Sequence, residues 1–284
     1  MPFEQRHVAI VTVAYSSADD MGGFLESVSA SDLRPTATLV ADNPSPQSDE
    51  TIVIAEAAGA TVVRMTENAG YGGAINAAVR TLGPDIEFLL ISNPDVRLDP
   101  QTTARLVGAM DGEPHAGAIG PKILNEDGSV YPSARQIPSL RTGFGHALFV
   151  RIWPTNPWTR SYRQEEESTD VPREVGWLSG ACVLVRRTAF DEIGGFDDRY
   201  FMYFEDVDLG FRLGRASWLN LYEPSAQVTH VGGRSTAGVR PQMLIAHHRS
   251  ADRFLSTRYH GWYLAPLRWA LHVGLAVRAR WLTR

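Results

Sequence analysis

The first hundred residues alternate short apolar segments with amphipathic ones, and this alternation constrains the fold more than any other feature. Four segments have the length and the β-branched or apolar composition of buried strands: 7–15, 38–42, 60–65 and 87–92. Helical patterns follow the first three of them: 17–30, 49–58 and the stretch that runs to Leu82. Apolar strands that alternate with helices predict a parallel sheet covered by helices.

The second half of the chain is less regular. Two strand-like segments, 116–123 and 175–186, flank a stretch rich in Pro, Trp and Arg, and the length of that stretch is typical of a functional loop. Helical patterns return at three places: 187–193, 205–216 and 241–259. No internal repeat divides the chain. We therefore expect one α/β domain with a predominantly parallel central sheet flanked by helices, followed by C-terminal helices.

Composition excludes several classes of protein. The net charge of −5 argues against a general nucleic-acid binder. The single cysteine, Cys182, has no partner for an internal disulfide, so a disulfide-rich secreted scaffold is excluded. The apolar run at 8–15 is too short for a secretion signal, and no stretch reaches the roughly eighteen apolar residues that span a bilayer. We expect a cytoplasmic protein that is soluble or peripheral to a membrane.

The C-terminal tail has a charge opposite to that of the rest of the chain. After Asp252 there are six arginines and no acidic residue, which leaves 21 basic against 32 acidic residues elsewhere. Residues 266–282 place leucines and Trp281 on one face and arginines elsewhere, a pattern typical of a helix at an anionic membrane surface. A helix that packs its leucine face on the protein core fits the same pattern.

Polar residues and glycines follow the expected strands, at the edge where open α/β sheets bind ligands. The first strand ends near Tyr15, the second at Asp42, the third leads into a Gly-rich loop at 68–72, and the fourth ends before Asp95. An aromatic ring, two carboxylates and a loop that allows close backbone approach suit a nucleoside diphosphate. Each element also has a simpler explanation: a tight turn for the glycines, and turn or cap roles for the two acids.

Five motifs occur in the order in which glycosyltransferase family 2 has them, and the chain resembles that family. They are Val11-Thr12-Val13-Ala14-Tyr15, Val40-Ala41-Asp42-Asn43, Asn68-Ala69-Gly70-Tyr71-Gly72, Asn93-Pro94-Asp95 and Tyr203-Phe204-Glu205-Asp206-Val207-Asp208. The resemblance implies a GT-A fold with a catalytic domain at 1–240. Its nucleotide-sugar-binding half would cover about 1–97 and its acceptor-binding and catalytic half 98–240, before a basic helical appendage at 241–284.

The resemblance also implies roles for these residues. The nucleotide-sugar donor would be bound by Thr12, Ala14, Tyr15, Asp42, Asn68, Gly70, Tyr71, Gly72 and Asn93. Asp206 would be the general base that an inverting sugar transfer requires, with Glu205 beside it near the acceptor. The alternative for both acids is a structural one, because negative side chains favour the positive N-terminus of the helix expected at 205–216.

A metal ion is implied by the same resemblance. Asn93-Pro94-Asp95 occupies the position of the family's D-x-D motif but lacks its first acid, so Asp95 is expected to carry most of the metal binding. His230 matches the position at which related enzymes place a metal-binding histidine, although a lone histidine is more often structural. Mn²⁺ or Mg²⁺ between the donor phosphates would stabilise the charge that grows on the leaving diphosphate.

Three further segments, 128–136, 153–158 and 175–180, resemble the cell-wall linker rhamnosyltransferases of actinobacteria. In that family the donor is dTDP-L-rhamnose and the acceptor is N-acetylglucosaminyl-diphospho-decaprenol, used in arabinogalactan biosynthesis. The resemblance implies an acceptor site that includes Arg135, Trp177, Gly180 and Arg234. It also implies a location on the inner face of the cell membrane, where the lipid-linked acceptor lies.

Other functions stay open. A family 2 enzyme with another sugar donor or a polysaccharide acceptor fits the same motifs. A sugar-phosphate nucleotidyltransferase would need a Gly-rich loop after the first strand, and residues 15–19 contain no glycine. A non-catalytic nucleotide-sugar-binding module would not need Glu205, Asp206 or His230. Nothing in the sequence indicates an oligomeric state.

Overall fold

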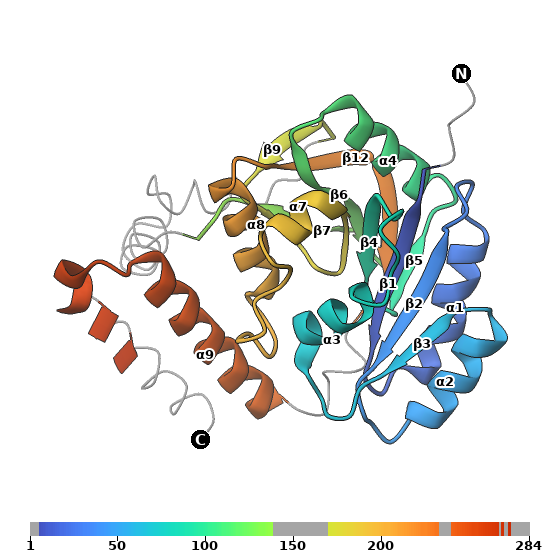
Figure 1. The fold of residues 1–284 in the computed structure, drawn as a ribbon, viewed down its shortest axis with the longest axis horizontal. Coiled ribbons are helices and arrows are strands. Elements are labelled where there is room, and N and C mark those ends of the chain that lie inside the picture. Colours follow the sequence, from blue (N-terminus) through green and yellow to red (C-terminus); the bar gives the residue numbers. More distant parts are fainter. Residues whose placement is uncertain (1–5, 139–169, 233–239, 267, 270–271, 274–284) are drawn as a thin grey trace.

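The computed structural model describes residues 6–138, 170–232, 240–266, 268–269 and 272–273 of the 284-residue chain. These residues form one central sheet with helices on both faces (Figure 1). The eight strands on its main path are β1 (Val8–Ala14), β2 (Ala37–Asp42), β3 (Thr61–Arg64), β4 (Phe88–Ser92), β5 (Val96–Leu98), β6 (Ala116–Asn125), β11 (Cys182–Arg186) and β12 (Leu219–His230).

The sheet is predominantly parallel, as expected from the apolar strands. Its order is β3-β2-β1-β4-β11-β6-β12-β5, and the first four strands in this order run parallel to one another. β11 lies antiparallel between β4 and β6, and β5 lies antiparallel to β12. Residues Val8 to Val11 of β1 face Phe88 to Ile91 of β4, so the two most apolar strands form the centre of the sheet.

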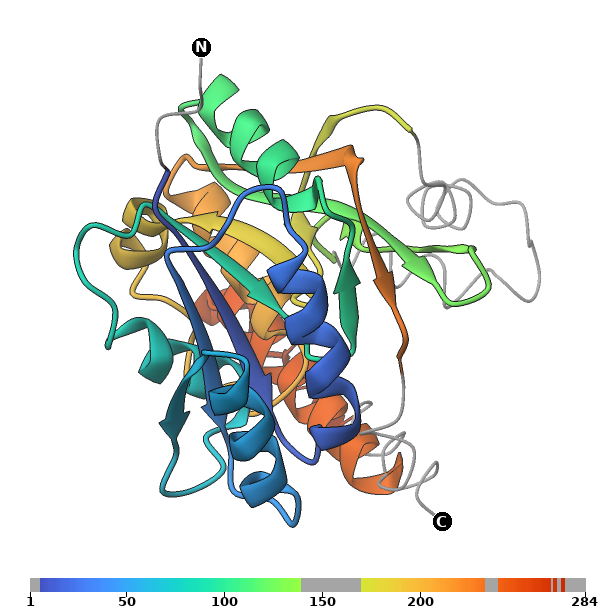
Figure 2. The ribbon, with the colours of Figure 1, turned by 90° about the vertical axis from the view of Figure 1, so that its right-hand side faces the viewer.

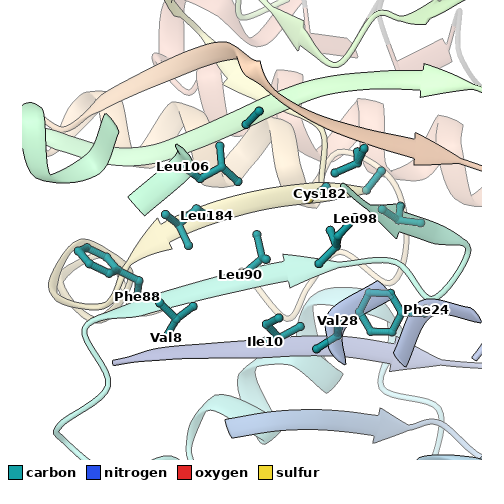
Figure 3. Packing of buried hydrophobic residues seen from close by; sticks show 14 of the residues in the cluster. Val8, Ile10, Phe24, Val28, Phe88, Leu90, Leu98, Leu106, Cys182 and Leu184 are labelled. Atoms are coloured by element: carbon teal, nitrogen blue, oxygen red, sulfur yellow. The ribbon is translucent and has the colours of Figure 1, made fainter. Parts of the chain in front are cut away.

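Helices cover the two faces of the sheet as separate groups. The helices are α1 (Ala18–Ser29), α2 (Ser48–Ala57), α3 (Gly70–Val79), α4 (Thr102–Gly112), α7 (Arg187–Glu192), α8 (Glu205–Arg215) and α9 (Arg240–Arg258). One hydrophobic cluster joins α1 and α4 to the face of β1 that carries Val8 and Ile10 (Figure 3). A second joins α3, α7 and α8 to the opposite face, where Ala9 and Val11 point. Both faces of β1 are therefore buried, which explains its uninterrupted apolar sequence.

The segment 175–186, expected as one strand, is divided into three. β9 (Arg173–Val175) pairs with β12, β10 (Trp177–Leu178) pairs with β8 (Ala134–Arg135) in a separate two-stranded sheet, and β11 enters the main sheet. A short β7 (Val130–Tyr131) extends β6. The breaks between these strands fall at Gly176 and at the turn that contains Gly180. A Cβ on Gly176 would lie 2.3 Å from the backbone nitrogen of Ile137. Glycine lets the chain leave and re-enter the sheet here.

α9 packs on the catalytic domain through an aromatic cluster. Phe254 is fully buried, and its ring lies 5.7 Å from the rings of Phe204 and Phe211. Ser250 donates a hydrogen bond of 2.8 Å to the carbonyl oxygen of Met202. β1 and β12 run toward the end of the molecule at which α9 lies (Figure 2). The first part of the expected appendage is therefore joined to the loop before α8.

The rest of the tail is mostly outside the described residues. Residues 266, 268–269 and 272–273 are described and are helical, whereas the other residues of the amphipathic segment expected over 266–282 lie outside the described residues. Among the residues that the structure describes, no helix is long and apolar enough to cross a membrane.

Candidate active site

A buried asparagine organises the donor edge, by which we mean the ends of β1, β2 and β4 together with the loop 68–72. The backbone N–H of Asn43 donates to the carbonyl of Ala14 at 3.0 Å. Its side-chain oxygen accepts from the N–H of Ala69 at 3.0 Å, and its amide donates to the carbonyl of Gly70 at 3.2 Å. Sequence reasoning placed Asn43 in a motif without giving it a role. An amide directly after a strand-end acid was the available signal.

The glycines of the loop are needed for close packing within the protein. Gly70 has a φ of +72°, and a Cβ there would lie 2.1 Å from the carbonyl oxygen of Phe201. The N–H of Tyr71 donates to that same oxygen at 3.1 Å. A Cβ on Gly72 would lie 2.7 Å from Cβ of Phe196. Both glycines therefore let the start of α3 approach the segment 196–201. Asn68 closes the loop by accepting from the N–H of Gly70 at 3.0 Å.

The remaining residues expected to bind the donor differ in exposure. The Tyr15 side chain is 42% exposed at the end of β1 and is open to a ligand. Asp42 is buried, accepts a hydrogen bond of 3.2 Å from Ser48, and has its pKa raised by that burial. Thr12 and Ala14 are fully buried inside β1, so the structure gives no support for a side-chain contact from either of them to a donor.

Asp95 and His230 lie together although 135 positions separate them in the chain. Nε2 of His230 is 3.1 Å from Oδ1 of Asp95, and the two side chains are 18% and 14% exposed. The pairing of β12 with β5 sets His230 opposite Val96, the residue after Asp95. The N–H of Val231 also donates to the carbonyl of Asp95 at 2.9 Å. The structure thus joins the two residues that were expected to bind a metal.

Asn93 lies beside this pair at the end of β4. Its backbone N–H donates to the carbonyl of Ala181 at 2.9 Å, and its own carbonyl accepts from the N–H of Val96. The backbone of the Asn93-Pro94-Asp95 turn is thereby fixed between β11 and β5. The ring of Tyr131 packs edge-on against the imidazole of His230, with the two ring centroids 5.8 Å apart.

Glu205 and Asp206, the acid pair, open helix α8. The two residues before them, Tyr203 and Phe204, both have a φ of +66°, a left-handed conformation that is costly for side chains of this size. The turn leads directly into the first turn of α8. Contacts with α9 hold it, because the ring of His247 lies 5.5 Å from that of Tyr203 and 5.4 Å from that of Phe204.

The two acids have different environments. Glu205 is buried, and its Oε2 has no hydrogen-bond partner; burial, together with the charge of Asp206, raises its pKa to about 8. Asp206 accepts two backbone hydrogen bonds, from Gly180 at 3.1 Å and from Val207 at 2.8 Å. Burial raises the pKa of Asp206, while these two N–H groups lower it. Glu205 therefore carries a proton at neutral pH, while the two backbone N–H groups favour the charged form of Asp206.

Tyr71 connects the donor edge with the acid pair. Its hydroxyl donates a hydrogen bond of 2.6 Å to the carbonyl oxygen of Gly180. Burial raises its pKa well above the usual value, and the negative charges of Glu205, Asp206 and Asp95 raise it further. Tyr71 therefore lies within electrostatic range of both the acid pair and Asp95.

The residues expected at the acceptor site are partly brought together. Arg135 and Trp177 are paired across β8 and β10, and the indole N–H of Trp177 donates to the carbonyl of Gln136 at 3.2 Å. The positive charge of Arg135 lowers the pKa of Asp206, and its Nε donates a hydrogen bond of 3.0 Å to the carbonyl of Pro132. Gly180 contacts Asp206 directly. Arg234 and the motif at 153–158 lie outside the described residues.

Polar residues at the strand ends of an α/β sheet, an aspartate–histidine pair and a buried acid pair are the features expected of a glycosyltransferase. The model of Glycosyl transferase family 2 matches residues 9–194, and the chain belongs to this family. Its sheet has the GT-A arrangement. A mannosyltransferase of Pyrobaculum calidifontis, solved in complex with GDP-Man and Mn²⁺, superimposes with a TM-score of 0.62 at 15% identity, over 99% of this chain and 73% of that one.

Among curated relatives, the N-acetylglucosaminyl-diphospho-decaprenol L-rhamnosyltransferase of Mycobacterium tuberculosis is 45% identical over 284 residues. The alignment covers 97% of this chain and 92% of the relative. The rhamnosyltransferase WbbL of Escherichia coli K12 is 26% identical over 175 residues, which cover 61% of this chain and 63% of that protein. The expected family is thereby confirmed, and the nucleotidyltransferase alternative is dropped.

Proposed function

We propose that this glycosyltransferase transfers L-rhamnose, with inversion, from dTDP-L-rhamnose to an N-acetylglucosaminyl-diphospho-polyprenol in the assembly of the cell-wall arabinogalactan linker. The observation that carries the proposal is the extent of the likeness to the mycobacterial rhamnosyltransferase, which covers almost the whole chain. A likeness restricted to the donor edge would support only the use of a nucleotide sugar. This one covers 97% of the chain and so extends well beyond the donor edge.

Asp206 is the proposed general base. The attacking hydroxyl of the acceptor must lose a proton as it bonds to the anomeric carbon, on the face opposite the departing diphosphate. Two backbone N–H groups orient the carboxylate of Asp206 and favour its charged form. Its raised pKa makes it a stronger base than a solvated aspartate. The protonated Glu205 beside it can donate a hydrogen bond to the acceptor from its unpartnered carboxyl group.

Asp95 and His230 are the proposed protein ligands of one Mn²⁺ or Mg²⁺ ion. A carboxylate oxygen and an imidazole nitrogen fit Mn²⁺ well, and Mg²⁺ accepts the oxygen. The described parts of the chain contain no group of three or more His, Cys, Asp or Glu side chains suited to a metal, and oxygen atoms of the donor phosphates and of water would complete the coordination. When bound, the ion stabilises negative charge on the leaving diphosphate. His230 must be neutral to bind it.

A peripheral position on the inner face of the cell membrane completes the proposal. Beyond α9, the side chains of Trp262, Tyr263 and Trp269 are 86%, 68% and 70% exposed. Exposed tryptophan and tyrosine in an arginine-rich segment are typical of a membrane interface. This surface lies next to α9, which contacts the turn before the acid pair, so a lipid-linked acceptor and the catalytic residues would be near one another.

The test is a panel of nucleotide sugars, assayed with a short-chain polyprenyl-diphospho-GlcNAc acceptor and Mn²⁺ or Mg²⁺. We expect dTDP-L-rhamnose to be the preferred donor, and dTDP release to depend on the acceptor. Faster transfer from another nucleotide sugar would leave the family assignment intact but contradict the rhamnosyl donor. Donor binding without any transfer across the panel would instead favour a non-catalytic nucleotide-sugar-binding module.

A further inference from the structure

Tyr71 differs from the other residues of the donor edge in where its polar atom points. It is the second residue of α3, and its ring packs edge-on against Phe196, with the ring centroids 6.1 Å apart. Its hydroxyl donates to the carbonyl oxygen of Gly180 at 2.6 Å. A phenol has one proton to donate, so this contact removes the hydroxyl as a hydrogen-bond donor toward a phosphate.

Gly180 in turn contacts the catalytic acid. The N–H of Gly180 donates to Oδ2 of Asp206 at 3.1 Å, while its carbonyl oxygen accepts from Tyr71. A Cβ on Gly180 would lie 3.3 Å from Cε1 of Tyr71 and 3.6 Å from Cβ of Asp206. The glycine is therefore sandwiched between the two side chains and bonded to both.

We propose that Tyr71 is a positioning residue that acts on Asp206 through Gly180, in place of the donor-binding role expected from its motif. This inference rests on the proposed function of Asp206 as the base. A glycine has more backbone freedom than any other residue, and Gly180 lies in the turn between β10 and β11. With its carbonyl fixed by Tyr71, the N–H of Gly180 keeps its direction toward the carboxylate.

The same arrangement links donor binding to base positioning. Tyr71 belongs to the loop that Asn43 ties to the end of β2, and its own N–H donates to the carbonyl of Phe201, three residues before Phe204. The backbone N–H of Tyr71 thus joins it to the segment that precedes the acid pair. Its hydroxyl joins it to Gly180, the glycine that orients Asp206. A movement of the loop 68–72 would therefore move Gly180 and change the hydrogen bond that Gly180 donates to Asp206.

The test is the variant Tyr71→Phe, which keeps the ring and removes the hydroxyl. Three groups from the described residues face Asp206: Glu205 beside it, Arg135 from β8 and Tyr71 from α3. Of these three groups, only the Tyr71 hydroxyl is altered in the variant. A looser N–H bond from Gly180 stabilises the carboxylate less, so the acidic limb of the kcat/KM profile moves to higher pH, by about 0.5 to 1. We expect kcat to fall about tenfold or less, and the donor Kd to stay within about twofold.

Tyr200→Phe is the matched control. Tyr200 is buried, and its hydroxyl has no hydrogen-bond partner among the residues that the structure describes, so the same atom is removed without breaking a bond. We expect its pH profile and kcat to match those of the unmodified enzyme. A donor Kd raised about tenfold in Tyr71→Phe, with an unmoved acidic limb, would overturn the inference and restore the donor-binding role. Unchanged kinetics would overturn it as well.

Two further variants separate the inference from the proposed function. In an Asp206→Asn background, Tyr71→Phe should change the residual rate less than about twofold, because the residue it positions is already inactive. A nearly normal rate in Asp206→Asn alone would instead refute Asp206 as the base. If Tyr71→Phe folds poorly, Gly180→Ala gives a second perturbation: the methyl group presses on the Tyr71 ring and should move the acidic limb in the same direction with an unchanged donor Kd. An unmoved limb in a folded Gly180→Ala enzyme would contradict the inference.

Discussion

The donor edge and the acid pair are built in different ways. The donor edge comes from consecutive strand–loop–helix units, in which each polar residue stands directly after its own strand. The acid pair depends on segments that are distant in the chain: Gly180 and Arg135 approach from β10 and β8, and α9 holds the preceding turn. The comparison teaches that ligand binding can be encoded locally, whereas the pKa and direction of a catalytic acid require tertiary contacts.

The largest effect expected is on the metal site, which lies between these two regions. Exhaustive chelation should reduce transfer to background, and Mn²⁺ or Mg²⁺ should restore it, because charge on the leaving diphosphate is then neutralised. His230→Ala should raise the Mn²⁺ concentration needed for half-maximal rate by about tenfold or more, by removing one of two protein ligands. Rate against metal concentration is the measurement. Full activity after chelation would shift charge neutralisation to arginine side chains, of which Arg234 is the first to test.

A second prediction concerns the contact between the two regions at Gly70. Gly70→Ala forces a methyl group against the carbonyl oxygen of Phe201 at a positive φ, and should lower the free energy of unfolding by about 2–4 kcal/mol. Gly22→Ala is the control, since Gly22 lies in α1 with nothing within 4 Å of the added Cβ. It should raise stability by about 0.5–1 kcal/mol through helix propensity. Equal effects in denaturant unfolding would show that the close approach at Gly70 is unimportant.

A third prediction uses the raised pKa of Glu205. Because this pKa is raised to about 8, Glu205 stays protonated in the folded protein at neutral pH and ionises as pH rises through 8. A second negative charge beside Asp206 should then reduce kcat, which gives an alkaline limb. Glu205→Gln mimics the protonated acid, so it should keep kcat at pH 7 within about tenfold and remove that limb.

The same variant gives a stability test with a definite sign. The unfolded chain loses the Glu205 proton near its ordinary pKa of 4.5, whereas the folded chain keeps it to about 8. The unmodified protein should therefore lose stability relative to Glu205→Gln as pH rises from about 4.5 to 8. Parallel stability curves across this range would contradict the assigned protonation state.

The structure of the donor edge was predicted from the sequence more fully than the surroundings of the acid pair. Six helices and the first four strands were predicted to within a few residues, because buried strands and amphipathic helices have local patterns, whereas α4 was not among the predicted segments. The pairing of Asp95 with His230 came from family resemblance alone, since no local pattern joins residues that far apart. The break of segment 175–186 into three strands was missed because its glycines serve contacts with Ile137 and Asp206, which only the folded chain reveals.

The smallest effect is expected at the tail. Deletion of residues 260–284 leaves α9 complete, and should lower activity about three- to tenfold on a long-chain lipid acceptor but little on a short soluble analogue. Binding of the intact protein to anionic liposomes should weaken, but persist, as salt rises. Phe254→Ala is the comparison, because it opens the core under the turn before Glu205 and should lower activity on both acceptors. Equal losses on both acceptors after the deletion would show that the tail is structural.

The separation of binding from chemistry is tested most directly in Asp206→Asn, with donor affinity and transfer rate measured on the same preparation. The substitution keeps the size of the side chain and removes its basicity. The account predicts a donor Kd within about twofold of the unmodified enzyme and a kcat lower by roughly 10²–10⁴. A kcat near normal would contradict it, and would leave Asp206 as a residue that only stabilises the N-terminus of α8.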